Sequence, residues 1–211
     1  MTQDPSKTEA KPNRQARRKE ATRQKLVDAA VEIFSEKGIN DTSVNDITER
    51  ADVAYGTFYN YFNSIEELPP EVIRKVITDH VSKVQVKLKG IDDIVLIVAI
   101  SVREVMRKVL TDKTMHWLSE RPVIMVNELM RSLYDDADRH HRIGVEMGRF
   151  SLPASRDDLH VFCSWGLTGL LQEAFRSQPD LPKLGDTMVS IYLRVLGVPD
   201  KEVKDALIKS R

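Results

Sequence analysis

The sequence has little of what marks a secreted or membrane-bound protein. Its single cysteine, Cys163, cannot form an internal disulfide, which fits a reducing compartment. Its longest unbroken apolar run, IVLIVAI at 94–100, has seven residues, far fewer than the roughly 18 that a membrane-spanning helix requires. Residues 1–24 are polar and lack the apolar core of a secretory signal. We therefore expect a cytoplasmic protein without membrane contact.

Motifs of catalysis and of metal binding are also missing. The sequence contains no glycine-rich phosphate loop and no H-E-x-x-H motif. Ser164 lies in CSWG, which does not complete the G-x-S-x-G pattern of a nucleophile elbow. His140 and His141 are adjacent, so on a helix they point about 100° apart and rarely bind one ion; with Asp138 they more often form a solvated polar face. We therefore expect no enzymatic activity, no cofactor and no metal site.

The sequence has no net charge, with 32 basic and 32 acidic residues, so its overall balance does not indicate nucleic-acid binding. The distribution is uneven, however, because six basic residues between positions 14 and 25 are accompanied by a single acidic one, Glu20. Taken alone, such a run is as often a solvated tail as a binding surface. The basic residues are Arg14, Arg17, Arg18, Lys19, Arg23 and Lys25.

The 211 residues suffice for one large domain or for a small and a larger one, and 41% hydrophobic with 30% charged residues indicates a folded protein. Residues 1–13 are polar, and we expect a disordered extension there. From Arg17 onward, apolar residues recur every three or four positions through Phe34. This pattern predicts a helix that ends at Lys37, with Gly38 as its C-cap.

Two shorter helices are predicted next. Ser43 and Asp46 have the spacing of a capping box, so a helix of about two turns should start there. After a tight link at Asp52-Val53, the segment AYGTFYNYF at 54–62 would form the second short helix. Two short helices joined by a tight link and preceded by a longer helix make a helix-turn-helix arrangement.

The second short helix would have a hidden and an open side. Phe58 and Phe62 can face the first helix, which leaves hydroxyl and amide groups facing out. Such groups bond to phosphate oxygens and to base edges. Gly56 costs about 1 kcal/mol in a helix interior, yet it lets a phosphate backbone approach closely. The segment therefore predicts a DNA-reading face. The side chains left facing out are Tyr55, Thr57, Tyr59 and Asn60.

Over residues 20–68 the sequence resembles the TetR family of bacterial transcriptional regulators. The resemblance is carried by LVDAAVEIFSEKG, by the T-S-V-N-D-I start and, most specifically, by A-x-V-x-x-G-T-F-Y-x-Y-F. It implies an all-α fold with an N-terminal three-helix DNA-binding domain, here residues 14–64. A C-terminal helical domain, here residues 65–211, would bind a small-molecule effector and form a homodimer.

The resemblance also implies roles for residues at matching positions. The start of the second helix would contact phosphate through Thr42 and Ser43. The third helix would contact base edges through Tyr55, Gly56, Thr57 and Asn60. The remaining two tyrosines, Tyr59 and Tyr61, would grip the DNA backbone.

The sequence departs from the family pattern at two places. The family often has lysine where this sequence has Tyr55 and Ile65, so the basic segment with Arg17 and Arg18 is expected to supply phosphate contacts. Pro69-Pro70 also lie where the fourth helix of the family usually runs unbroken. Because proline is tolerated only in the first turn, that helix either begins near Pro69 or is kinked there.

Further helices are predicted along the C-terminal part. One covers residues 71–89, and the next extends the IVLIVAI run to Val109. Two or three helices lie between Thr114 and Phe150, one of them starting at Pro122. A helix follows a second capping box at Ser155 and Asp158, and the last is the segment LGDTMVSIYLRVLG. Gly197 and Pro199 mark the end of the last one.

Methionine and aromatic side chains in this part suit an adaptable apolar pocket, but they suit an ordinary core as well. The candidates for ligand contact are Met106, Trp117, Met125, Met130, Phe150 and Phe162. The resemblance places the dimer interface on the last two predicted helices. The candidates for it are Leu159, Gly166, Gly169, Leu170, Met188, Ile191, Tyr192 and Val195. Gly166 and Gly169 together cost about 2 kcal/mol against alanine, so we expect another helix to approach them closely.

The sequence thus predicts a sequence-specific DNA-binding transcriptional regulator, most simply a repressor that a small, largely apolar ligand releases from a palindromic operator. The alternative is a small-molecule binding protein that keeps the fold but has weak or no DNA recognition. The two missing lysines and the Pro69-Pro70 junction favour that alternative.

Overall fold

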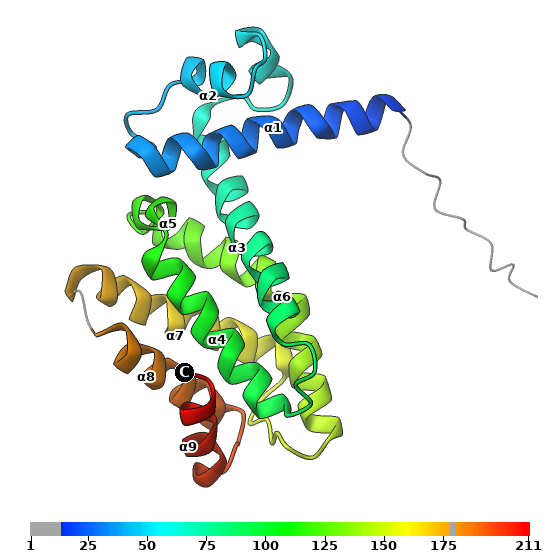
Figure 1. Cartoon of the computed structure of the whole chain (residues 1–211), viewed down its shortest axis with the longest axis vertical. Coiled ribbons are helices and arrows are strands. Elements are labelled where there is room, and N and C mark those ends of the chain that lie inside the picture. The colour runs from blue at the N-terminus through cyan, green and yellow to red at the C-terminus, as the bar shows by residue number, and fades with distance from the viewer. Residues whose placement is uncertain (1–13, 178–179) are drawn as a thin grey trace, which may run out of the picture.

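The computed structural model describes residues 14–177 and 180–211, in which the elements are helices and no strand occurs (Figure 1). The extension predicted over 1–13 lies outside the described residues. The helices are α1 (Arg14–Lys37), α2 (Val44–Arg50), η1 (Tyr55–Asn60), η2 (Ile65–Glu67), α3 (Leu68–Lys87), α4 (Ile94–Thr111), α5 (Lys113–Leu118), α6 (Pro122–Glu146), α7 (Arg156–Ser177), α8 (Leu181–Val195) and α9 (Asp200–Lys209). The predicted all-α fold is confirmed.

Helices α1 and α2 begin a small N-terminal bundle. The apolar stripe of α1 is buried, with Leu26, Ala30 and Phe34 fully inaccessible to solvent. Helix α2 starts at the predicted capping box: the Asp46 backbone N–H donates to the Ser43 hydroxyl at 3.2 Å, and the Ser43 N–H donates to the Asp46 carboxylate at 2.7 Å. These two bonds satisfy backbone amides that the first turn of a helix leaves free.

The link between α2 and η1 turns on a single residue. Asp52 has a φ of 53°, a left-handed conformation that aspartate tolerates better than most residues. The Val53 N–H closes the turn by donating to the Thr48 carbonyl at 3.0 Å. The second short helix then forms as a 3₁₀-helix, tighter than the α-helix expected from the sequence.

The buried side of η1 joins the core of the bundle. Phe58 and Phe62 are both buried, and their ring centroids lie 5.5 Å apart. They belong to one apolar cluster with Phe34 of α1 and Ile47 of α2. The orientation predicted for the two phenylalanines is therefore confirmed, and η1 is fixed to the bundle by this side.

The Pro69-Pro70 pair starts α3 and does not kink it. Helix α3 begins at Leu68, and the prolines occupy its first turn, where no intrahelical N–H bond is lost. The short helix η2 precedes it, so the break in the family pattern lies just before α3. From this start, α3 runs out of the small bundle and along the larger helical domain (Figure 1).

The larger domain packs around α4. The IVLIVAI run forms its first two turns, and the Asp93 carboxylate caps it by accepting from the Val95 N–H at 3.0 Å. Helix α4 contacts α3, α6, α7, α8 and α9, which explains why it is apolar on most sides. The C-terminal helix α9, which follows Pro199, was not predicted from the sequence. Its Val203 and Ala206 are buried in the cluster formed with α4 and α8.

Apolar and ionic contacts join the two domains. One buried cluster extends from Phe34 of α1 through Val72 of α3 to Met115 of α5. Arg23 of α1 pairs with Glu71 of α3 at 2.8 Å, and Arg74 of α3 pairs with the buried Glu128 of α6 at 2.9 Å. Glu71 and Arg74 also pair with each other at 3.0 Å, so the first turns of α3 are linked by ion pairs to both domains.

Candidate functional site

The outer side of η1 is exposed and polar. Tyr55 and Tyr59 are 53% and 50% exposed, their ring centroids lie 5.7 Å apart, and their hydroxyls are 3.1 Å apart, within hydrogen-bond distance. The hydrogen bond with Tyr55 raises the pKa of Tyr59 above its ordinary value. Asn60 is also exposed, while Thr57 is half-buried. The residues of this segment that were predicted to contact DNA therefore gather on one surface. The exception is Tyr61, which is half-buried against the core.

Gly56 lies on this surface with nothing above it. No heavy atom of the described residues is within 4 Å of the position that an added Cβ would take, and its φ is not in the left-handed region. The protomer itself therefore does not require glycine here. A requirement for close approach by another molecule would explain the residue.

The two residues at the start of α2 differ in their accessibility. Thr42 is buried, and its hydroxyl donates to the Gly38 carbonyl, which corrects its prediction as a DNA contact. Ser43 is exposed, and its hydroxyl lies 2.6 Å from the Asp46 carboxylate. Lys37 bonds to that carboxylate at 2.8 Å and, together with Ser43, holds the pKa of Asp46 well below its usual range. Ser43 therefore stays a candidate, whereas Thr42 has a purely structural role in the turn.

The first turns of α1 form an exposed basic segment. Residues 14–21 have exposed side chains throughout, and this end of α1 projects beyond the helices that pack on its other half (Figure 1). Within the part of the chain that the structure describes, five cations of α1 form no ion pair. They are Arg14, Arg17, Arg18, Lys19 and Lys25. The other basic residues of the bundle are paired internally, including Arg23 with Glu71 and Arg50 with Glu32 and Glu36.

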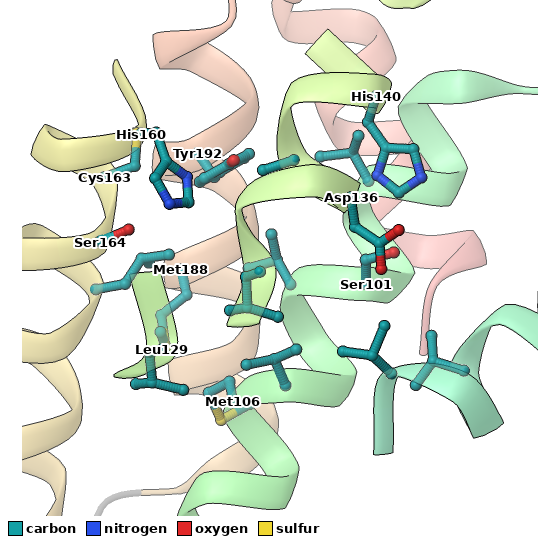
Figure 2. Close-up of a pocket in the computed structure, with 18 of the residues that line it drawn as sticks. Ser101, Met106, Leu129, Asp136, His140, His160, Cys163, Ser164, Met188 and Tyr192 are labelled. Atoms are coloured by element: carbon teal, nitrogen blue, oxygen red, sulfur yellow. The ribbon is translucent and has the colours of Figure 1, made fainter. Parts of the chain in front are cut away.

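A cavity of about 130 Å³ lies in the larger domain, between α3, α4, α6, α7 and α8. Most of its wall is apolar, and Met106 of α4, Leu129 of α6 and Met188 of α8 belong to it (Figure 2). Figure 2 shows His160, Ser164 and Tyr192 on one side, and Asp136, His140 and Ser101 on the other. The cavity is thus a small apolar chamber with polar groups at its two ends.

The polar wall from α7 carries two hydrogen-bonding groups. His160 is buried, and its Nε2 lies 2.9 Å from the Met130 carbonyl. Because a carbonyl only accepts, this nitrogen must be the donor, and in the tautomer with a single ring proton Nδ1 is then an acceptor. Ser164, one turn further along α7, has no hydrogen bond within residues 14–177 and 180–211. Burial also raises the pKa of the neighbouring Cys163 thiol to about 11, so it is uncharged.

Beside them, His141 of α6 is almost fully buried and bonds through Nε2 to the Tyr192 hydroxyl at 3.0 Å. Burial, with contributions from the facing His160 and His140, lowers the pKa of His141 to about 4. Asp138 favours the charged ring and Arg156 opposes it. The ring is therefore neutral at pH 7.

Acid should destabilise the protein through His141. Its pKa in the folded state is below the ordinary value of 6.5, so the unfolded chain binds the proton first. The stabilisation is complete above pH 6.5 and is lost as the pH falls to about 4, by up to about 3 kcal/mol. Urea titrations at pH 7, 5.5 and 4 should show that His141→Phe loses much of this fall in the free energy of unfolding. An unchanged pH dependence in the variant would contradict the assignment.

The structure corrects most of the predicted ligand contacts, since only Met106 lines the cavity. The Trp117 indole packs on Gly38, and Phe150 packs on Gly144, where a Cβ would collide with its ring. Met125 is fully buried elsewhere in the core, and Met130 lines a separate surface hollow. These residues fill space between helices, which was the competing interpretation of the sequence.

The outer face of α7 is apolar and open. Phe162 is 66% exposed and Trp165 is 48% exposed, which corrects the prediction of Phe162 as a ligand contact. Gly166 and Gly169 are exposed on the same face, with no heavy atom of the described residues within 4 Å of an added Cβ. The spacing 162, 165, 166 and 169 follows one side of a helix. This face, which includes Trp165, was only partly recognised from the sequence.

The other predicted interface residues divide into two groups. Leu159, Met188 and Tyr192 are buried inside the protomer, and the last two line the cavity. Their prediction as interface residues is therefore corrected, because a residue without exposed surface has little to offer a partner. Ile191 of α8 is 46% exposed, and the remaining two are half-buried. Those two are Leu170 and Val195.

Among residues 14–177 and 180–211, no group of three His, Cys, Asp or Glu side chains is arranged to hold a metal ion. None of the helices in these ranges is at once long and apolar enough to cross a lipid bilayer.

Comparison with known proteins gives consistent matches. The model of bacterial regulatory proteins of the tetR family matches residues 26–72, and that of a tetracyclin repressor-like C-terminal domain matches residues 93–209. The uncharacterized HTH-type transcriptional regulator YvdT of Bacillus subtilis (strain 168) is 37% identical over 70 residues, 33% of this chain and 36% of that protein. The HTH-type transcriptional repressor DhaR of Mycobacterium sp. (strain GP1) is 39% identical over 57 residues, 27% of this chain and 29% of that protein. These alignments span about a third of the length of the curated relatives.

A solved structure matches over nearly the whole chain. RolR in complex with its ligand resorcinol is 27% identical, with a TM-score of 0.79 over 91% of this chain and 95% of that one. RolR without ligand is 25% identical, with a TM-score of 0.77. The C-terminal family model covers more than half of this chain, and the N-terminal model covers the helix-turn-helix. The chain therefore belongs to the TetR family of bacterial regulatory proteins.

Proposed function

We propose that this protein is a homodimeric, cytoplasmic transcriptional regulator, most simply a repressor, which a small and largely apolar ligand releases from a palindromic operator. The observation that carries the proposal is the two-sided η1 segment. Its phenylalanines anchor it to the bundle, and its opposite side offers hydroxyl, amide and bare backbone groups to solvent.

That open side suits double-stranded DNA. Tyrosine, threonine and asparagine each hydrogen-bond to phosphate oxygens or base edges, and Gly56 leaves room for a phosphate backbone. Tyr55 and Ile65 carry no charge where the family often has lysine. The α1 cations that form no ion pair within the described residues would replace that charge, and each phosphate contact gains free energy from counterion release. These cations argue against the alternative function, a binding protein without DNA recognition.

The outer face of α7 suits a second copy of the chain. An exposed stripe of two aromatic rings and two glycines is costly in solvent and lets another helix approach closely. A twofold dimer would place two η1 segments on successive turns of the same DNA face, about 34–36 Å apart. We therefore propose Gly166, Gly169, Ile191, Leu170 and Val195 as interface residues, together with Phe162 and Trp165.

The cavity suits the ligand that controls release. Helix α3 forms part of its wall and continues into the DNA-binding bundle, where Glu71 pairs with Arg23. The dimer would exchange between two conformations that differ in the position of α3. A ligand that binds one conformation more tightly increases its population, and only this difference in affinity is required. RolR, which binds resorcinol, supports a small ligand for this cavity.

The proposal is tested by selecting duplexes from a random pool and measuring binding by mobility shift. We expect a palindromic site whose affinity falls steeply as the salt concentration rises, since phosphate contacts dominate. Tyr55→Ala and Thr57→Ala should each weaken this site by about 1–3 kcal/mol, or roughly 5- to 150-fold. Lack of any preferred duplex, or unchanged affinity in both variants, would reject the assignment of η1.

A further inference from the structure

We infer that the effector is an uncharged, single-ring molecule that carries a hydroxyl group, and that His160 and Ser164 of α7 bind this hydroxyl. The inference rests on the proposed function in taking the cavity as the effector site. It adds the chemical class of the effector and the two residues that recognise it.

The size of the cavity restricts the ligand to one ring. A chamber of about 130 Å³ is close to the roughly 150 Å³ of apolar cavities that hold benzene. It is much smaller than the roughly 300–1,000 Å³ typical of sites for larger ligands. The wall consists mainly of valine, leucine and methionine side chains, and methionine sulfur makes favourable contacts with aromatic rings. A flat ring therefore suits both the volume and the lining.

The charges around the cavity exclude an ionised ligand. No lysine or arginine lines it, so a carboxylate would be buried without a counter-ion. Its one acidic residue, Asp136, already accepts from the Gln85 amide at 3.1 Å and pairs with Arg139. His140 at that end has its pKa lowered, mainly by burial, so it adds no charge at neutral pH.

The free polar groups of α7 select a hydroxyl. His160 donates from Nε2 to the Met130 carbonyl, so in the tautomer with a single ring proton its Nδ1 accepts. The Ser164 hydroxyl, which forms no hydrogen bond among the described residues, can both donate and accept. The two residues are four apart on α7, so they share one face of the helix. A ligand hydroxyl can donate to one and accept from the other. An apolar ligand of the same size can make neither hydrogen bond, so it lacks a net gain of about 0.5–1.5 kcal/mol for each.

Calorimetric titration of the full-length wild type with phenol and with toluene tests the inference, because the two differ only in hydroxyl against methyl. Phenol is expected to bind at least about 10-fold more tightly, and benzoate, which is ionised, should not bind detectably. Equal or tighter binding of toluene, or tight binding of benzoate, would overturn it. This comparison needs no variant, so it holds even if a substitution affects folding.

Two serine variants then locate the hydroxyl. Ser164 forms no side-chain hydrogen bond within residues 14–177 and 180–211, so Ser164→Ala should fold normally, weaken phenol binding by about 5- to 10-fold and leave toluene binding unchanged. Ser132 of α6 is the matched control, since its buried hydroxyl is also unpaired but lies outside the cavity lining. Ser132→Ala should change neither ligand. Equal loss of phenol and toluene in Ser164→Ala, or no loss, would remove Ser164 from the site.

Operator binding, measured separately without ligand, distinguishes the two proposals. A protein that binds its operator but prefers toluene to phenol refutes the inference alone. A protein that prefers phenol but binds no duplex supports the inference and refutes the proposed function.

Discussion

Trp165→Glu is expected to convert the proposed dimer into monomers and to lower operator affinity by at least about 100-fold. Trp165 is half-exposed at the centre of the apolar face of α7, between Phe162 and Gly169. In a dimer, its replacement would bury a carboxylate without a partner. Two linked half-sites bind about 10²- to 10⁴-fold more tightly than one, and a monomer loses this gain. Sedimentation velocity and mobility shift measure the two effects.

Val86→Glu is the matched control for this prediction. Val86 of α3 is 63% exposed and lies outside both the α7 face and the cavity lining. The same charge there should leave the dimer and operator affinity unchanged. If Trp165→Glu still sediments as a dimer at micromolar concentration, the interface lies elsewhere on the molecule.

Substitution of Gly56 is expected to separate DNA binding from folding. Because an added Cβ meets no heavy atom of the described residues, Gly56→Ala should keep or raise the free energy of unfolding, by up to about 1 kcal/mol from helix propensity, and the melting temperature should not fall. The methyl group would nevertheless occupy the space of a phosphate backbone, so operator affinity should fall by about 10-fold. Gly56→Glu adds repulsion between like charges and should lower affinity by about 100-fold or more.

The control for the added charge is Ser82→Glu. Ser82 is exposed on α3 in the larger domain, and its hydroxyl bonds only within its own helix. This variant should bind the operator as the wild type does. Wild-type affinity in Gly56→Glu would mean that no DNA approaches η1, and the proposed reading face would have to be abandoned.

Local patterns in the sequence predicted the N-terminal bundle well, because they act over a few residues. Ser43 and Asp46 identify a capping box by spacing alone, and Phe58 and Phe62 share a helical face by periodicity. Thr42 shows where such reasoning fails. Its type and position suit a phosphate contact, but its hydroxyl is occupied by the Gly38 carbonyl, which only the folded turn brings within reach.

The cavity could not be located from the sequence. Methionines and aromatics were plausible linings, yet Met125, Trp117 and Phe150 fill the core elsewhere. The two residues that we assign to ligand recognition are His160 and Ser164, and neither type marks a buried site, because histidine is intermediate in burial and serine is mostly exposed. Their role depends on which side of α7 faces α4 and α8, and that choice is made by packing between distant helices.

The sequence by itself determined most of the helices before α9, the capping box of α2 and the face that η1 shows, since these follow from hydrogen bonds and spacings within a few turns. Helix α7 marks the limit of that information. It carries one stripe with His160 and Ser164 and another with Phe162 and Trp165. Both stripes have helical spacing, so periodicity cannot tell which is inside. Only the tertiary structure decided it, because burial depends on the neighbours that the whole fold brings together.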